Sequence, residues 1–198
     1  MRTLEEAALE ASTCPRCRLA QGRTQVVYGT GSSDADLMFI GEGPGYYEDK
    51  QGEPFVGAAG QLLNRMLEEV GIRREDVWIC NVIKCRPPGN RDPYPDEVEA
   101  CAPWLREQIA LIDPRVIVTL GNFATRFILD RPASISRVRG QRFPIDGRTV
   151  IPTFHPAAVL HGGGEASAQM TALRADFQEI KAALAEMPQP VEEQLGLF

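Results

Sequence analysis

The sequence contains only two histidines and no long hydrophobic run. No apolar stretch approaches the roughly 18 residues of a membrane-spanning helix, so we expect no membrane span. The first residues lack a basic segment followed by an apolar one, and no secretory signal is visible. We therefore expect a cytoplasmic protein, in which disulfides are not expected. A histidine with a chemical role must be His155 or His161, and His161 is less suited to precise chemistry because glycines follow it.

The length and composition are those of one ordinary globular domain. Of the 198 residues, 43% are hydrophobic and 24% are charged, and a chain of this length buries a substantial core. We expect a monomer with one domain over residues 1–187. A tail, 188–198, begins at a Pro-Gln-Pro segment.

The net charge of −6 argues against indiscriminate binding of polyanions, but basic residues are concentrated locally. Five arginines and one acid lie between Arg131 and Arg148, and Lys84, Arg86 and Arg91 form a second cluster. These clusters fit a local basic face on an acidic protein. Solvated charges on unrelated faces fit the charge pattern equally well.

Strands alternate with helices along the chain. Continuous apolar runs predict buried strands over residues 37–40, 77–83 and 116–120, Val26–Tyr28 is a further strand candidate, and Asp146-Gly147 predicts a hairpin. Helical periodicity or start signals predict helices over 58–70, 95–112 and 168–187. We expect an α/β fold, a three-layer α/β/α sandwich around a central, mainly parallel, four-stranded sheet.

The segment from Gly41 to Gly57 is predicted to be a long loop rich in glycine and proline between a buried strand and a helix. Open α/β sheets bind ligands at this end of their strands. The segment matches neither the dinucleotide fingerprint nor the phosphate-binding P-loop. This segment alone is compatible both with a ligand-binding loop and with an incidental surface loop.

The five cysteines lie at positions 14, 17, 80, 85 and 101. Cys14 and Cys17 have the spacing of a ligand pair, and Cys85 and Cys101 would complete a set of four. Cys80 lies inside a predicted strand and is interpreted as a buried core thiol. The spacing favours a metal site over scattered thiols, with zinc and an iron–sulfur cluster both open.

Four features occur together in this chain. Gly41-Glu42-Gly43-Pro44-Gly45 is followed by Phe55-Val56-Gly57, Asn81 precedes Lys84-Cys85-Arg86-Pro87-Pro88, the four cysteines accompany them, and His155-Pro156-Ala157 follows. In this order they resemble the family 4 uracil-DNA glycosylases, the iron–sulfur members of that superfamily. The similarity spans about Cys14 to Leu160.

The resemblance implies a monofunctional enzyme that removes uracil from DNA, and a [4Fe-4S] cluster on Cys14, Cys17, Cys85 and Cys101. It also implies the roles of individual side chains. Phe55 would stack on the flipped uracil, Asn81 would bind its polar edge, and His155 would face its O2. Glu42 and the backbone at Gly43 would position water, Asn90 is a further functional candidate, and Glu48 would help to exclude thymine.

These roles agree with the chemistry of base excision. The base must leave the duplex to be reached, which costs a few kcal/mol, and stacking on an aromatic ring recovers about 1–3 kcal/mol. An asparagine amide supplies one donor and one acceptor, as O4 and N3–H of uracil require. A donor from His155 would stabilise the departing base, and the Glu42 carboxylate would stabilise the cationic sugar.

Two departures from the family pattern are visible. Tyr46-Tyr47 replaces positions that are often acidic, and the bulky wedge that commonly follows the histidine motif is replaced by Ala158-Val159-Leu160 before three glycines. Leu160 is the residue that could still enter the base stack. The segment from Arg86 to Pro93 contains no histidine, which disfavours the covalent chemistry of some relatives.

The chain ends in Gln194-Leu195-Gly196-Leu197-Phe198 after a proline-rich, acidic spacer. The pentapeptide resembles the bacterial motif that binds the DNA polymerase sliding clamp, which would tether the enzyme near replication forks. The alternative is an end that folds back onto the domain.

Two further functions remain open at this point. A non-catalytic iron–sulfur module would use the same pocket only to recognise nucleic acid, and a zinc-stabilised protein would bind nucleotides. Metal analysis and a uracil-excision assay distinguish these alternatives from the enzyme.

Overall fold

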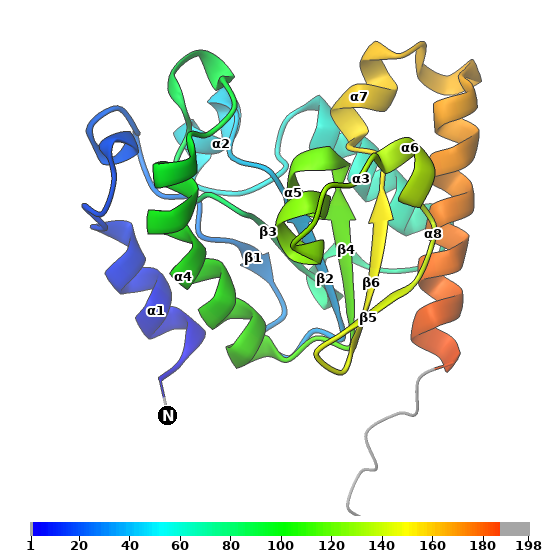
Figure 1. The fold of residues 1–198 in the computed structure, drawn as a ribbon, viewed down its shortest axis with the longest axis horizontal. Helices are drawn as coiled ribbons and strands as arrows, with labels where there is room; N and C mark the ends of the chain where they lie inside the picture. Colours follow the sequence, from blue (N-terminus) through cyan, green and yellow to red (C-terminus); the bar gives the residue numbers. More distant parts are fainter. Residues whose placement is uncertain (1, 187–198) are drawn as a thin grey trace, which may run out of the picture.

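The computed structural model describes residues 2–186 of the chain (Figure 1). The helices are α1 (Leu4–Ser12), α2 (Tyr46–Gln51), α3 (Ala58–Glu69), α4 (Pro95–Ile112), α5 (Gly121–Leu129), α6 (Ile135–Val138), α7 (Pro156–His161) and α8 (Ala168–Glu186). The strands are β1 (Thr30–Gly31), β2 (Leu37–Gly41), β3 (Trp78–Asn81), β4 (Val116–Leu120), β5 (Phe143–Ile145) and β6 (Arg148–Thr153).

The strands form one six-stranded sheet in the order β1-β3-β2-β4-β6-β5. The central four strands run parallel, while β1 and β5 pair antiparallel with β3 and β6 at the two edges. The α/β class and the mainly parallel sheet are confirmed, and the expected count of four strands is wrong. The edge strands are short and partly exposed, so they lack the apolar runs that mark buried strands.

The segment Val26–Tyr28 is not a strand. Val27 N donates to Lys84 O at 2.8 Å, but the first strand begins only at Thr30, where β1 pairs with β3. The hairpin predicted at Asp146-Gly147 is confirmed, because β5 and β6 pair on either side of it.

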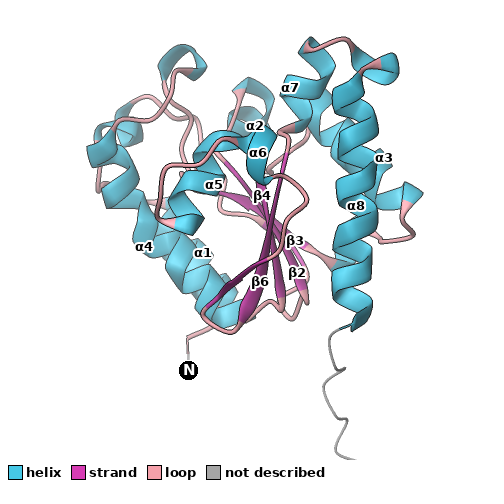
Figure 2. Ribbon diagram, turned by 45° about the vertical axis from the view of Figure 1, so that its right-hand side comes forward, coloured by secondary structure: helices cyan, strands magenta, loops and turns pink. Residues whose placement is uncertain are grey.

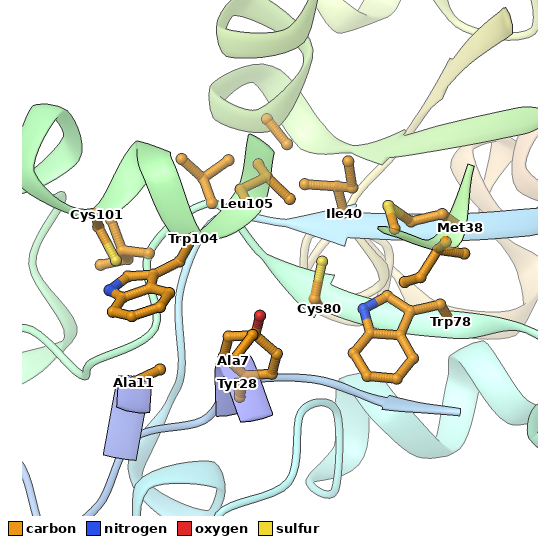
Figure 3. Close-up of a cluster of buried hydrophobic side chains, with 14 of the residues drawn as sticks. Ala7, Ala11, Tyr28, Met38, Ile40, Trp78, Cys80, Cys101, Trp104 and Leu105 are labelled. Carbon is orange, nitrogen blue, oxygen red and sulfur yellow. The ribbon is translucent and has the colours of Figure 1, made fainter. Parts of the chain in front are cut away.

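Helices cover both faces of the sheet (Figure 2). Apolar side chains of α1, α4 and α5 pack on one face, and those of α3 and α8 pack on the other. Along β2, Met38 and Ile40 join the first cluster while Leu37 and Phe39 join the second, as the alternation of side chains along a strand requires. Figure 3 shows the first cluster, in which Cys80 is a fully buried core thiol as predicted.

The segment Gly41–Gly57, expected to be a loop throughout, contains the helix α2. This short helix lacks the repeating apolar positions that would reveal it in the sequence. Its glycine C-cap, Gly52, has φ +78°, a conformation that glycine adopts without strain.

No helix within residues 2–186 combines the length and apolar character needed to cross a membrane. The predicted tail, 188–198, and its Gln194–Phe198 motif lie outside the described residues.

Candidate active site

A pocket of about 570 Å³ opens at the carboxyl ends of the parallel strands, between α2, α3 and α7. This volume is in the range of pockets that bind small organic ligands. Seven of the eight predicted catalytic and substrate-binding residues line it: Glu42, Gly43, Glu48, Phe55, Asn81, Asn90 and His155. The eighth, Leu160, lies on α7 outside the lining and is 37% exposed. The fold therefore brings together segments far apart in the sequence.

Gly41 ends β2 where Phe55 and Asn81 meet. A Cβ atom at this position would lie 2.4 Å from Asn81 Oδ1 and 2.8 Å from Phe55 Cζ, distances at which the atoms would clash. Only glycine therefore lets the aromatic ring and the amide approach each other beside the strand.

Phe55 is held in a strained conformation. Its φ is +55°, in the left-handed region that a bulky residue rarely adopts. A Cβ on Gly60 of α3 would lie 1.7 Å from Phe55 O, so the glycine allows the helix to pack directly against this carbonyl. Arg74 donates to Pro54 O at 2.7 Å. Strain that the surrounding structure imposes in this way is characteristic of functional sites.

Glu48 fixes the same segment from the other side. Its Oε1 accepts hydrogen bonds from Val56 N at 3.0 Å and Gly57 N at 3.1 Å. The carboxylate thus lines the pocket and also positions the backbone that follows Phe55, a contact that the sequence does not reveal.

Asn81 is the last residue of β3 and is almost fully buried. Its Oδ1 faces Phe55 across Gly41 and has no hydrogen-bond partner among residues 2–186. Buried side-chain oxygens nearly always have a partner, and a missing one costs about 1–3 kcal/mol. Asn81 Oδ1 is therefore ready to accept a hydrogen bond from a donor that enters the pocket.

His155 is the N-cap of α7, and its Nδ1 accepts a hydrogen bond from Ala157 N at 3.1 Å. This contact leaves the proton of the neutral imidazole on Nε2, which is then a donor. Desolvation lowers the pKa of His155 to about 4, with a smaller opposing effect from Glu48. The side chain is therefore neutral at physiological pH.

The rings of Phe55 and His155 lie 5.6 Å apart at an interplanar angle of 29°. A base stacked between two rings needs about 6.8 Å, twice the stacking distance of about 3.4 Å. The two rings are too close for a base to lie between them. A Cβ on Gly121 would lie 3.1 Å from His155 Cβ, which shows how closely the start of α5 approaches His155.

Glu42 directly follows β2 and is partly buried. Ile83 N donates to Glu42 O at 3.1 Å, which holds this backbone beside the end of β3. Desolvation, with a smaller contribution from Asp92, raises the pKa of Glu42 above its ordinary value of 4.5. A carboxylate with a raised pKa in a pocket is a candidate for acid–base or electrostatic catalysis.

Asn90 lies on the loop after β3 with φ +55°. Its Oδ1 accepts a hydrogen bond from Arg86 Nε at 2.6 Å. The next residue, Arg91, lines the pocket and makes a two-pronged ion pair with the buried Glu97 of α4, at 2.8 and 2.6 Å. These arginines organise the loop and were not predicted as site residues, because nothing in their spacing distinguishes them from surface charges.

Several residues of the two predicted basic clusters are buried or paired with carboxylates instead of forming a basic surface. Lys84 is 1% exposed, and its Nζ donates to Asn81 O at 2.8 Å and Gln108 Oε1 at 2.5 Å. Lys84 therefore supports the strand end that carries Asn81. In the cluster between Arg131 and Arg148, Arg139 and Arg142 pair with carboxylates of α8, and Arg148 pairs with Asp113.

The four predicted metal ligands line a second, small pocket between α1, α4 and the loop after β3: Cys14, Cys17, Cys85 and Cys101. None of them forms a disulfide. N–H groups point at three of the sulfurs: Trp104 Nε1 at Cys14 (3.4 Å), Arg23 Nη1 at Cys85 (3.5 Å) and Lys84 N at Cys101 (3.2 Å). Within residues 2–186, no three His, Cys, Asp or Glu side chains are arranged to hold one metal ion.

The sequence matches the model of the uracil DNA glycosylase superfamily over residues 28–180. It is 52% identical to the type-4 uracil-DNA glycosylase of Thermotoga maritima over 161 residues, which is 79% of this chain and 83% of the relative. It is 43% identical to the type-4 enzyme of Saccharolobus solfataricus, covering 95% of this chain and 89% of that one.

A type-5 uracil-DNA glycosylase of Thermus thermophilus is more distant, at 30% identity over 65% of this chain and 68% of the relative. The match to type-4 enzymes is therefore both closer and longer. By its sequence, this chain belongs to the uracil-DNA glycosylase superfamily and, within it, to the type-4 uracil-DNA glycosylases.

Proposed function

We propose that this chain is a uracil-DNA glycosylase that hydrolyses the N-glycosidic bond of an extruded deoxyuridine and leaves an abasic site, the first step of base excision repair. Family membership supports this activity. The structural observation that supports it best is the buried, unpartnered Oδ1 of Asn81 beside an aromatic ring, a neutral histidine and a carboxylate.

Recognition of the base follows from these donors and acceptors. Uracil stacked on Phe55 presents N3–H to Asn81 Oδ1 and O4 to the amide N–H of the same side chain. Cytosine has an acceptor at N3 and a donor at C4, so it would oppose both hydrogen bonds. A site built on such hydrogen bonds rejects the mismatched base by large factors.

Cleavage of the N-glycosidic bond leaves negative charge on the base and positive charge on the sugar, and the pocket contains one group to stabilise each charge. The base leaves as an anion, which the Nε2–H of neutral His155 stabilises at O2. The sugar becomes cationic, and the Glu42 carboxylate stabilises it electrostatically. Glu42 and the backbone at Gly43 also position the water that attacks the sugar, so no covalent enzyme intermediate forms.

Glu48 and Asn90 act on the geometry of the pocket. Glu48 holds the segment after Phe55 through its two backbone hydrogen bonds, and in this position it narrows the space beside the base where thymine carries its methyl group. Asn90, held by Arg86, lies on the facing loop. Leu160 is the apolar residue available at the rim of the pocket to fill the gap in the base stack.

The four cysteines fit a [4Fe-4S] cluster. They surround one pocket without forming disulfides, and backbone and side-chain N–H groups approach three sulfurs as they do around thiolate ligands. Four cysteine thiolates are the ligand set of [4Fe-4S] clusters. When bound, the cluster would link the segment after α1 to α4.

The substrate of this activity is DNA that contains uracil, and the protein acts as a monomer. The Gln194–Phe198 motif would bind a sliding clamp and raise the local enzyme concentration at forks. Titrating the clamp with full-length protein and with a variant ending at Glu193 tests this interaction. Equal affinities would exclude the motif as the binding segment.

Incubation with oligonucleotides that contain one uracil, thymine or cytosine, followed by alkali, tests the activity. Strand breaks are expected only at uracil, because cytosine does not match the Asn81 amide and Glu48 narrows the space that the methyl group of thymine needs. If protein with its cluster intact yields no breaks at uracil in single-stranded or duplex DNA, catalysis is refuted. The non-catalytic module that only recognises nucleic acid is then the remaining function.

A further inference from the structure

Large hydrophobic side chains with high exposure gather around the active-site pocket. In residues 2–186 they are Leu9, Tyr46, Tyr47, Tyr94 and Leu160. Only Leu9, on α1, belongs to an element that does not border the pocket. Exposed apolar groups that concentrate at one place mark an interaction surface.

Tyr46 and Tyr47 begin α2, directly between the pocket residues Gly45 and Glu48. They are 49% and 62% exposed, and their rings meet edge to face at 5.4 Å. A Cβ on Gly57 would lie 3.9 Å from Tyr47 Cδ2, so Tyr47 reaches the segment that follows Phe55.

Cations alternate with these aromatic rings. Arg86 lies 5.1 Å from the centroid of Tyr46 and bonds to Asn90 of the pocket. Arg91, which lines the pocket, lies 3.7 Å from the centroid of Tyr94, itself 46% exposed. Figure 1 shows α2 beside the loop that leads into α4, the two segments that carry these residues.

We propose that the tyrosine arc, defined as Tyr46, Tyr47, Arg86, Arg91 and Tyr94, binds the unpaired nucleotides that flank the extruded uridine in the same strand. The bases stack on the tyrosine rings while the phosphates lie near the arginines. Aromatic faces alternating with positive charge are the usual means of binding single-stranded nucleic acid without sequence preference. The identification of DNA as the bound molecule rests on the proposed function, whereas the exposed aromatic surface does not depend on it.

Two observations favour DNA over a protein partner on this arc. It is continuous with the pocket that takes the uracil, through Asn90 and Arg91. It also brings to the pocket mouth, on a chain of net charge −6, Arg86, which bonds to the uncharged Asn90, and Arg91, which is paired with Glu97.

Binding is measured first, with a uracil-free, single-stranded oligonucleotide and fluorescence anisotropy, so that the result does not depend on catalysis. The double variant Tyr46→Ala/Tyr47→Ala should raise Kd about tenfold or more. Tyr46→Phe/Tyr47→Phe keeps both rings and should bind within about twofold of the original protein. Leu9→Ala is the matched control for loss of an exposed apolar side chain and should change nothing.

Excision kinetics then identify the occupant. On single-stranded DNA the Ala variant should raise KM about tenfold with kcat within about twofold, and removing the bases on either side of the uridine should abolish this difference. Equal effects with and without flanking bases, or a Phe variant as weak as the Ala variant, would overturn the proposal. Failure of the original protein to excise uracil would refute the proposed function but leave the anisotropy result as a test of the surface.

Discussion

His155 and Glu42 are the two titratable side chains on which the proposed chemistry depends, and burial shifts their pKa values in opposite directions. The pKa of His155 is lowered to about 4, and the pKa of Glu42 is raised above 4.5, in both cases mainly by desolvation. The imidazole therefore acts as a neutral donor throughout the physiological range, and Glu42 must lose its proton to act. These roles predict a definite pH profile.

The value of kcat/KM should fall as the pH drops, because protonation of Glu42 removes the carboxylate that we propose stabilises the sugar. The midpoint should lie above 4.5, and no loss should occur near pH 6.5, because His155 is already neutral there. Glu42→Gln should lower kcat by about 100-fold or more and remove the acidic limb. Single-turnover rates between pH 4.5 and 9 measure this profile. If the acidic limb persists in Glu42→Gln and disappears in His155→Asn, the limb reports His155 and the role given to Glu42 is wrong.

Single residues also show what the sequence could not reveal. The motif resemblance named Phe55, Asn81 and His155, and the structure places all three at one pocket. It did not identify Lys84 as a buried support for Asn81, since a lysine in a basic segment has the same appearance as a surface charge. Such a role depends on Gln108 from a distant helix, which no local pattern contains.

At the scale of elements, α3 packs directly against the Phe55 segment because Gly60 has no side chain. Replacing Gly60 by Ala should favour the helix intrinsically by about 1 kcal/mol. However, the new Cβ would lie 1.7 Å from Phe55 O, and backbone cannot yield cheaply there. The cost of the clash should therefore exceed the gain in helix propensity.

Gly60→Ala is expected to lower the free energy of unfolding by about 1–3 kcal/mol and to raise KM, because it displaces the Phe55 ring that we propose stacks on uracil. Gly22→Ala is the matched control, since a Cβ there meets nothing within 4 Å. Urea unfolding and steady-state kinetics give both quantities. A Gly60→Ala variant as stable and active as Gly22→Ala would contradict the packing described for Phe55.

The elements that the sequence predicts well are those with strong periodicity. The helix expected over 95–112 is α4, and the buried runs at 37–40 and 116–120 are β2 and β4. The failures are short elements stabilised by their surroundings: α2 has no apolar period, and β1 has two residues whose pairing depends on β3. Their existence is decided by tertiary contacts rather than by local preference.

At the scale of the molecule, the cysteine pocket joins the segment after α1 to α4 and to the loop after β3. That loop continues directly from Asn81 through Lys84 to Cys85. The proposed cluster site and the proposed uracil pocket therefore share one short segment, although they are separate pockets. Loss of the cluster should loosen the amino-terminal region first.

Cys14→Ser/Cys17→Ser is expected to lose the visible absorbance of an iron–sulfur cluster and to increase hydrogen exchange over residues 2–31. Protection over α8 should persist, because its contacts lie in the opposite apolar cluster. Cys80→Ser, at a cysteine outside the predicted ligand set, controls for loss of a thiol and should keep the absorbance. Uniform loss of protection, or a cluster retained in the double variant, would contradict this arrangement.

The most direct measurement compares uracil with N3-methyluracil in single-stranded DNA, using the original protein and Asn81→Ala. Methylation removes the N3–H that Asn81 Oδ1 is expected to accept. The original protein should excise uracil at least about 100-fold faster than N3-methyluracil, and this ratio should fall below about tenfold in Asn81→Ala. The same ratio in both proteins would show that Asn81 does not read the base, and the account of the pocket would be wrong.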